Sequence, residues 1–387
     1  MRSRPRFGFP LLAALFAVLL ATPAGAKETV KLAYIAPLTG GNSANGLGGR
    51  NSADLAVKLH NADPRSKYDY ELVVLDDECK PEAGVQVATK AAADKGIIAG
   101  VTHYCSVVAM ATLETYHRFG LPVIVWGAVL PDITESGYKE IHRVNGTMDI
   151  QNQVAAKFML AQGYRRWGII HDTTDYGKGH DKFFSKYVKA GGGQVLVDLG
   201  VTADQQDFTA ELTQEKAANP QVLYFGGLTP IGVRIRAQME KAGLNAQFQG
   251  TSGIVSDDFI RGLGPLAEGT LAFHDGTPAA KLPGGKFFLE NYAKQNYAQS
   301  PEAYGPYAYV AAMLLMDTID KVGPNRKKVN EELARVKDRE SIVGKVTFDE
   351  HGQNVNPIVT KYIVQDGKWV TWEDSEYATG KRKLRGL

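Results

Sequence analysis

Apolar and polar positions alternate along the chain in two regular patterns. Short runs rich in β-branched residues, apolar on both faces, predict buried strands at 30–36, 70–76, 97–101 and 122–128. Between them, amphipathic stretches with a helical period predict helices at 49–63, 82–96 and 106–119. Such alternation is typical of a doubly wound α/β unit, in which helices cover both faces of a parallel sheet.

The same alternation of predicted helices and strands begins again near residue 150. We expect helices at 150–164, 178–190, 208–218 and 232–244. The strands expected in this half are 166–172, 194–201, 222–227 and 246–251. From about 269 the pattern changes to a strand and loop, a long apolar helix at 304–323, and a β-hairpin at 356–372 whose turn is Asp366-Gly367. The sequence therefore predicts two α/β halves, followed by a C-terminal part from about residue 269 in which the chain returns to them.

The N-terminus predicts export. Residues 1–26 combine Arg2, Arg4 and Arg6, an 11-residue apolar run and a small-residue cleavage signal, which together are typical of a cleavable signal peptide. The alternative is a membrane anchor, but the run is too short for a membrane span of about 20 residues. The formal net charge of +2 becomes −1 once the three arginines are removed. This balance excludes the strongly basic surface that a nucleic-acid partner requires.

Cysteine usage fits an oxidising compartment. Cys79 and Cys105 are the only two cysteines in 387 residues, and no CxxC motif occurs. One disulfide is the simplest interpretation in an exported protein, and two free buried thiols are the alternative.

The chain carries no catalytic constellation. GxSxG, HExxH and Walker A sequences are absent, and "GLGPLA" at 262–267 follows no strand and contains Pro265, so it fails as a dinucleotide-binding motif. The eight histidines show no metal-ligand spacing; we expect structural, hydrogen-bonded histidines at His103, His142, His171 and His274. We therefore expect no enzyme, no metal and no cofactor.

Two stretches follow predicted strands at the edge where doubly wound sheets bind ligands. They are "HYCSVV" at 103–108 and "WGAVLPDIT" at 126–134. Free amides at such turns favour an anion such as a carboxylate. Ser106 is either a ligand contact or a simple helix N-cap, or both.

At these motifs the chain resembles the periplasmic leucine/isoleucine/valine-binding proteins of ABC importers. The resemblance spans nearly all of the mature chain, from "KLAYIAPLTGG" through "LDDECKPEAG", "HYCSVV", "PDIT", "DYGKG" and "AYGPYAYVAA". It implies two lobes joined by three crossovers, with lobe 1 at 27–147 plus 275–355 and lobe 2 at 148–274 plus 356–387. It also implies a Cys79–Cys105 disulfide, a ligand cleft between the lobes, a monomer in the periplasm and an inner-membrane ABC permease as partner.

The resemblance also carries over a ligand site, residue by residue. Ser106 matches the family's carboxylate-binding serine, and Tyr176 its cleft tyrosine. Where amino-acid binders have a threonine, this chain has Val129; where they have the ammonium-binding acid, it has Ser252. The full set of expected ligand-binding residues is Asn45, Tyr104, Ser106, Gly127, Ala128, Val129, Tyr176, Thr229, Ser252 and Tyr307.

Because the residues at the ammonium-binding positions differ, the site favours a small carboxylate without an α-amine as its ligand. An aromatic acid that stacks on Trp126 or the cleft tyrosines is one such ligand. Asp257 or Asp258 could instead replace the missing acid. The alternatives are a branched-chain or other amino-acid binder of the same family, and a soluble sensor lobe that presents its ligand to a membrane receptor. A secreted enzyme is the third alternative, and the missing nucleophile–base pair speaks against it.

Overall fold

The first half of the chain builds one parallel sheet because its strands are apolar on both faces. The structure is a computed structural model that describes residues 27–387, so the expected signal peptide lies outside the described residues. Five strands pair in the order β2-β1-β3-β4-β5, all parallel. Their bounds are β1 Thr29–Ala36, β2 Asp69–Asp76, β3 Ile97–Thr102, β4 Val123–Val125 and β5 Ile141–Arg143.

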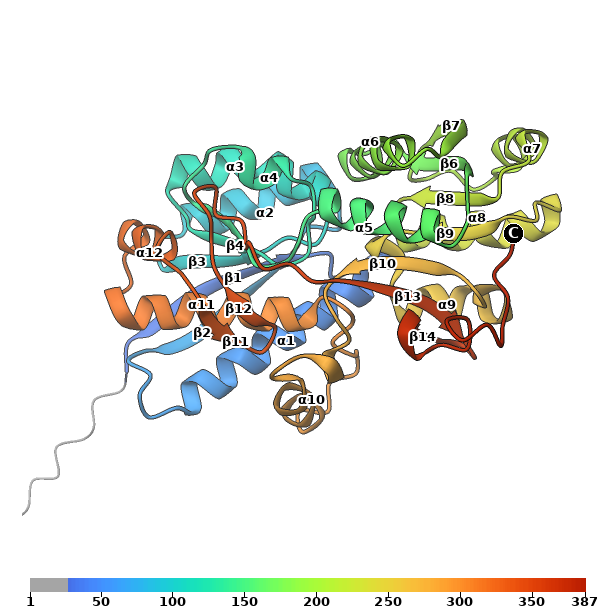
Figure 1. Cartoon of the computed structure of the whole chain (residues 1–387). Coiled ribbons are helices and arrows are strands. Elements are labelled where there is room, and N and C mark those ends of the chain that lie inside the picture. The colour runs from blue at the N-terminus through green and yellow to red at the C-terminus, as the bar shows by residue number, and fades with distance from the viewer. Residues whose placement is uncertain (1–26) are drawn as a thin grey trace, which may run out of the picture.

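Helices cover both faces of this sheet. In Figure 1, α2 and α3 lie above it and α1 and α11 below it. The long apolar α11 comes from far along the chain and packs against α1, and the small pair β11–β12 and α12 complete the lobe. The bounds are α1 Ser43–Ala62, α2 Pro81–Ala93, α3 Ser106–Phe119, α4 Asp132–Glu135, α11 Gly305–Val322, α12 Arg326–Leu333, β11 Arg339–Ser341 and β12 Gly344–Val346.

The second lobe has a mixed sheet in the order β14-β13-β10-β9-β8-β6-β7. The strands from β7 to β10 are parallel, whereas β13 and β14 add an antiparallel hairpin. The strands are β6 Arg166–Asp172, β7 Gln194–Val201, β8 Val222–Gly226, β9 Gln247–Gly250, β10 Leu271–Asp275, β13 Val359–Gln365 and β14 Lys368–Thr371. The helices are α5 Met148–Ala161, α6 Asp175–Ala190, α7 Thr209–Ala218, α8 Thr229–Ala242 and α9 Asp257–Leu263. Helix α10 Gly285–Ala293 follows the second crossover, and its buried Phe288 and Tyr292 pack in the core of the first lobe.

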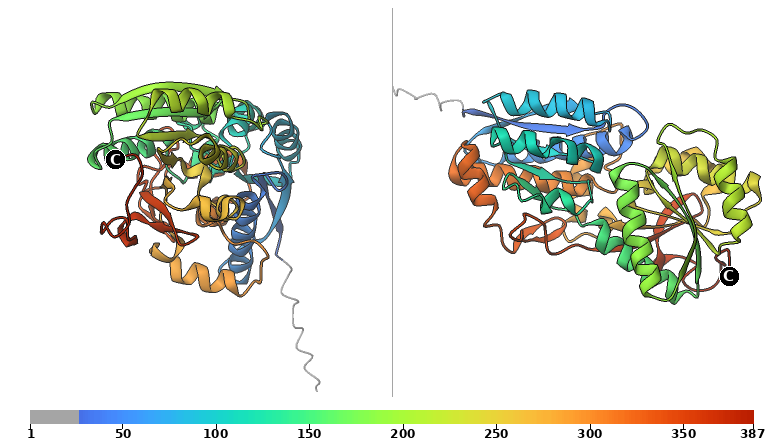
Figure 2. Two further views of the ribbon diagram at one scale, coloured as in Figure 1. Left: turned by 90° about the vertical axis from the view of Figure 1, so that its right-hand side faces the viewer. Right: turned by 90° about the horizontal axis from the view of Figure 1, so that it is seen from above.

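The chain passes between the two sheets three times: after β5, after β10 and after β12. Figure 2 shows the two lobes side by side with these segments between them. The predicted fold class is thus confirmed, and the exact lobe boundaries near 147, 274 and 355 stay a prediction. Within residues 27–387, no helix combines the length and apolarity needed to cross a membrane.

Most predicted elements are found, and three details were wrong. The hairpin turn is confirmed, because Asp366 and Gly367 have φ of 52° and 69°, as a type I′ turn requires. Helix α1 begins at Ser43 instead of 49, and strand 122–128 shortens to β4. The short elements β5, α4, α9, α10, α12, β11 and β12 were not predicted, since none carries a long periodic pattern.

Candidate functional site

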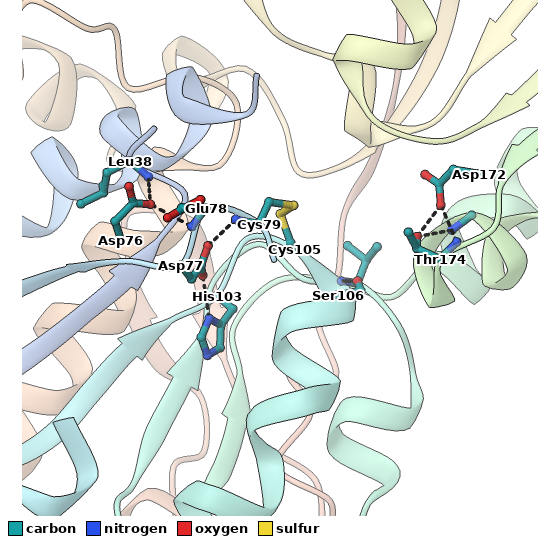
Figure 3. The surroundings of a disulfide bond; sticks show 12 residues. Leu38, Asp76, Asp77, Glu78, Cys79, His103, Cys105, Ser106, Asp172 and Thr174 are labelled. Carbon is teal, nitrogen blue, oxygen red and sulfur yellow. Dashed lines mark hydrogen bonds and ion pairs between the residues drawn. A yellow bond between two sulfur atoms is a disulfide. The ribbon is translucent and has the colours of Figure 1, made fainter. Parts of the chain in front are cut away.

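The predicted disulfide is present and fixes one wall of the site. Cys79 and Cys105 are bonded, with Cα atoms 5.6 Å apart, and join the loop after β2 to the residue just before α3 (Figure 3). Behind the bond, the fully buried Asp77 accepts from the Cys79 amide (2.9 Å) and pairs with His103 Nδ1 (3.0 Å). Ser106, next to Cys105, is therefore held on a cross-linked and hydrogen-bonded support.

Ser106 faces the residues that follow β4. We call residues 126–130 the β4 loop. Ser106 Oγ accepts from the amides of Val129 (3.2 Å) and Leu130 (3.4 Å). Cys105 provides no side-chain cap for α3, and within residues 27–387 the amides of Ser106 and Val107 have no intramolecular acceptor. The Ser106 hydroxyl and these first-turn amides can thus donate to an anion at the helix N-terminus.

The facing lobe contributes a cluster of neutral hydroxyl groups. The buried Tyr176 hydroxyl lies 2.9 Å from Thr251 Oγ1 and 3.5 Å from Ser252 Oγ, and it accepts from the Gly253 amide (2.9 Å). Burial raises the pKa of Tyr176, so this phenol stays protonated at neutral pH. Thr229 Oγ1 donates to Gly253 O (2.9 Å).

A cavity of about 230 Å³ lies between the two groups. Lobe 1 lines it with Asn42, Glu78, Cys79, Lys80, Cys105, Ser106 and Val107. Lobe 2 lines it with Asp172, Thr174, Tyr176, Ala203, Leu228, Pro230 and Ile231. Figure 3 shows Asp172 and Thr174 across from Ser106 and the disulfide. Its position between the lobes makes this cavity the candidate ligand cleft.

Of the ten predicted ligand residues, Ser106 and Tyr176 line this cavity. Gly127, Ala128 and Val129 lie in the β4 loop behind Ser106, and Ser252 lies behind Tyr176. Thr229 is turned towards Gly253 and Ser256. The remaining three are buried away from the cavity lining: Asn45 on α1, Tyr104 before Cys105, and Tyr307 on α11.

Trp126 was wrongly expected to offer a stacking face. The ring is fully buried, with Tyr34 stacked at 5.9 Å and Tyr104 at 6.0 Å between centroids. Gly49 adds a further contact, because a Cβ there would lie 2.6 Å from the indole. Trp126 is therefore a core residue that supports the β4 loop, and the ring nearest to the site is that of Tyr176.

A buried carboxylate at the second crossover was not predicted. Asp275 accepts from Gln151 Nε2 (3.1 Å) and Tyr304 Oη (2.5 Å) through Oδ1, and from Asn145 Nδ2 (3.2 Å) through Oδ2. Burial raises its pKa to about 6, although these hydrogen bonds oppose the shift. Gln151 Oε1 in turn accepts from the Ser252 amide (3.3 Å), which links this carboxylate to the hydroxyl cluster.

The two acids downstream of Ser252 do not supply the missing partner. Asp257 is exposed and its carboxylate accepts from Ser300, whereas Asp258 pairs with Arg261. Two acids line the cavity. Glu78 pairs with Lys80 (2.7 Å), whereas Asp172 Oδ1 accepts from Thr174 and burial raises the pKa of Asp172. The hypothesis that Asp257 or Asp258 compensates for Ser252 is therefore wrong in this structure.

The four histidines that were expected to be hydrogen-bonded differ in whether their ring nitrogens have partners. His103 is hydrogen-bonded as expected, and His171 Nδ1 donates to Asp172 O (2.8 Å). Both ring nitrogens of His274 are buried without a partner among the described residues, so the expected hydrogen bond was wrong there. His142 Nδ1 also has no partner among these residues, although the ring hydrogen-bonds the Glu140 backbone. The ligand atoms of His171, Asp181 and Asp198 lie within 4.8 Å of one another, a grouping that spacing along the sequence does not reveal.

Two α/β lobes around a small interlobe cavity define a solute-binding protein. Residues 29–368 match the periplasmic binding protein family. The chain therefore belongs to this family, as a solute-binding protein of the branched-chain amino-acid type that serves ABC transporters.

Two relatives share 32% identity with this chain. The leucine-, isoleucine-, valine-, threonine- and alanine-binding protein of Pseudomonas aeruginosa aligns over 91% of this chain and 94% of its own. A Leu/Ile/Val-binding protein of Rhizobium johnstonii aligns over 94% of this chain and 99% of its own. Both are named as binding proteins and not as enzymes.

Solved structures agree with the fold. A leucine-binding protein from Thermotoga maritima superposes with a TM-score of 0.81 at 27% identity, covering 88% of this chain and 97% of its own. A solute-binding protein from R. palustris in complex with benzoate has a TM-score of 0.79 at 19% identity and covers 89% and 95%. The resemblance inferred from the sequence is thus confirmed.

Proposed function

We propose that this protein is the periplasmic receptor of an ABC importer and that it captures a small carboxylate that lacks an α-ammonium group. The single observation that carries the proposal is the contrast between the two walls of the cleft. Ser106, with the amides of its helix N-terminus, offers donors to an anion. On the facing lobe, Tyr176 with Thr251 and Ser252 behind it forms a cluster of neutral hydroxyls. The acid on that side, Asp172, has a pKa raised by burial and accepts from the Thr174 amide.

Electrostatics decides between the two ligand classes. A buried ammonium stripped of its anionic partner costs about 3–5 kcal/mol, which is about two to four decades in affinity. A carboxylate at a helix N-terminus is stabilised by the amides and the helix dipole. The walls of this cleft therefore favour an acid whose remainder is uncharged.

Among small carboxylates, we favour an aromatic acid as the ligand. Tyr176 lines the cavity beside the apolar Leu228 and Ile231, which suits a flat apolar body. Pairing with one aromatic ring adds about 0.5–1.5 kcal/mol. The R. palustris protein in complex with benzoate has the same fold.

The second candidate is an amino-acid binder of the same family. It is favoured by the names of the two relatives at 32% identity. Asp172 could serve an ammonium group in that case, because it lines the cavity from the lobe opposite Ser106, whereas the other lining acid, Glu78, is paired with Lys80.

The remaining parts of the proposal come from the sequence. Residues 1–26 would direct export, and the mature chain would act as a monomer that delivers its ligand to an inner-membrane permease.

Calorimetry with leucine, phenylacetate and 4-hydroxybenzoate tests the ligand class. We expect at least one aromatic acid to bind about a hundredfold or more tightly than leucine, for the reason given above. Ser252→Asp should reverse the order, since it places a carboxylate in the hydroxyl cluster. Micromolar or tighter leucine binding without any response to the aromatic acids would reject the proposal in favour of the amino-acid binder.

Replacing Ser106 tests the anion side of the cleft. Ser106→Ala removes the hydroxyl and leaves the Val129 and Leu130 amides without their acceptor. We expect the affinity for the preferred carboxylate to fall by about 1–3 kcal/mol. Ser185→Ala is the matched control, because Ser185 hydrogen-bonds Asp181 on α6 outside the cleft. Equal affinity of both variants in calorimetry would show that Ser106 only begins the helix.

A further inference from the structure

Arg143, the last residue of β5, is an unusual core residue. Its side chain is fully buried, and among residues 27–387 no carboxylate lies within ion-pair distance of it. Burial lowers its pKa to about 10, so the guanidinium remains a cation at neutral pH. Burying an unpaired cation is unfavourable unless its donors are all well placed. The hydrogen bonds that Arg143 makes therefore indicate the role of this buried positive charge.

Most of these hydrogen bonds hold the β4 loop and the residues just after it. Nη1 donates to the carbonyls of Leu130 (2.6 Å) and Ala128 (3.3 Å), and Nη2 donates to Thr134 Oγ1 (3.2 Å). Nε donates to Gln353 Oε1 (2.5 Å), which lies just before the third crossover. One planar group thus fixes two carbonyls of the loop from behind, as the fork of an arginine allows.

One peptide group connects this cation to the cleft. The Ala128 carbonyl belongs to the same peptide unit as the Val129 amide, and that amide donates to Ser106 Oγ (3.2 Å). The negative end of the peptide dipole therefore meets Arg143, and the positive end points at Ser106. Hydrogen bonds in such a chain polarise one another, so each donor becomes stronger.

The geometry points to Arg143 as a positioning residue for carboxylate recognition: it orients the β4 loop and transmits its positive charge through the 128–129 peptide to Ser106. This role rests on the proposed function, because it requires that the Ser106 side of the cleft receives a carboxylate. Arg143 does not line the cavity, so it acts through the loop and Ser106. A purely structural arginine would support acidic and neutral ligands equally.

The experiment compares each acid with its neutral amide. Calorimetry on the full mature chain uses 4-hydroxybenzoate against 4-hydroxybenzamide, and L-leucine against L-leucinamide. The acid-to-amide affinity ratio reports recognition of the negative charge, whereas general damage to the cleft lowers both members of a pair. Circular dichroism establishes folding of every variant.

Arg143→Gln should lower the ratio about ten- to a hundredfold, the effect of losing a charge-assisted hydrogen bond. Arg143→Lys keeps the charge but loses the planar guanidinium with its several donors. It should therefore lower the affinity for the acid and for its amide alike, and keep the ratio within about threefold of wild type. Arg236→Gln is the matched control. Arg236 is also buried, but it pairs with Glu240 on α8. It should leave the ratio unchanged.

If Arg143→Gln does not fold, Gln353→Glu carries the test, because it keeps the acceptor for Nε and places a carboxylate beside the guanidinium that offsets its positive charge, so the ratio should fall. An unchanged ratio in Arg143→Gln, or in Gln353→Glu where only that variant folds, overturns the role of Arg143. Wild-type protein that binds neither acid more tightly than its amide overturns the carboxylate site itself. A wild type that prefers leucine to the aromatic acid rejects only the proposed ligand class, and the leucine pair then tests Arg143.

Discussion

A variant with alanine at both Cys79 and Cys105 is expected to lose about 3–4 kcal/mol of unfolding free energy. The bond closes a loop across a sequence separation of 26 residues, and on the chain-entropy model a loop of that size gives about this stabilisation. Ligand affinity should fall as well, because Ser106 directly follows Cys105 and loses part of its support. Urea denaturation and calorimetry measure the two effects.

Two comparisons isolate the bond from the change of side chains. Wild type treated with a reductant should resemble the double variant in urea. Titration of denatured, unreduced wild type with a thiol reagent should find no free thiol. Two free thiols per chain would show that the bond does not form in the exported protein, and unchanged stability after reduction would contradict the stabilisation.

The fold could be predicted largely from the sequence, because strands and helices here have strong periodic patterns. Helix α3, strand β6 and strand β7 begin and end where the pattern places them. Helix α1 is the instructive miss, since its first turns read as the loop sequence "SANGLGG". The Tyr34 hydroxyl donates to Gly46 O, and Gly48 packs against the backbone of Ser300 and Pro301. These tertiary contacts override a poor local helix propensity.

The site was predictable only in part. The cysteine pair and the motifs beside it identified Ser106 and the β4 loop, because they lie close together in sequence. Asp275 and Arg143 could not be found that way, since their partners Tyr304, Gln151 and Gln353 are brought in by the crossovers. Trp126 shows the opposite error: this first residue of the β4 loop was expected to offer a stacking face to an aromatic ligand, and its neighbours in space bury it.

Glu215 on α7 is a further buried acid that the sequence does not reveal, and it lies outside the cleft. Its side chain is fully buried, and neither carboxyl oxygen has a hydrogen-bond partner among the described residues. Gly168 on β6 makes room for it, because a Cβ there would lie 1.6 Å from Oε2. Burial, followed by the negative charge of Asp198, raises the pKa of Glu215 to about 8. The native protein therefore holds a proton at neutral pH that the unfolded chain releases.

Stability should consequently fall as the pH rises through the range between the unfolded pKa of Glu215 and about 8. Below that range both states are protonated, so Glu215→Gln should match wild type at pH 4; at pH 8.5 the variant should be more stable by about 2–4 kcal/mol. Urea denaturation across this range measures the difference. Glu211→Gln, one turn earlier on α7 and partly exposed, is the matched control and should follow wild type. A stability difference between Glu215→Gln and wild type that stays constant with pH would mean that Glu215 ionises as easily in the native protein as in the unfolded chain.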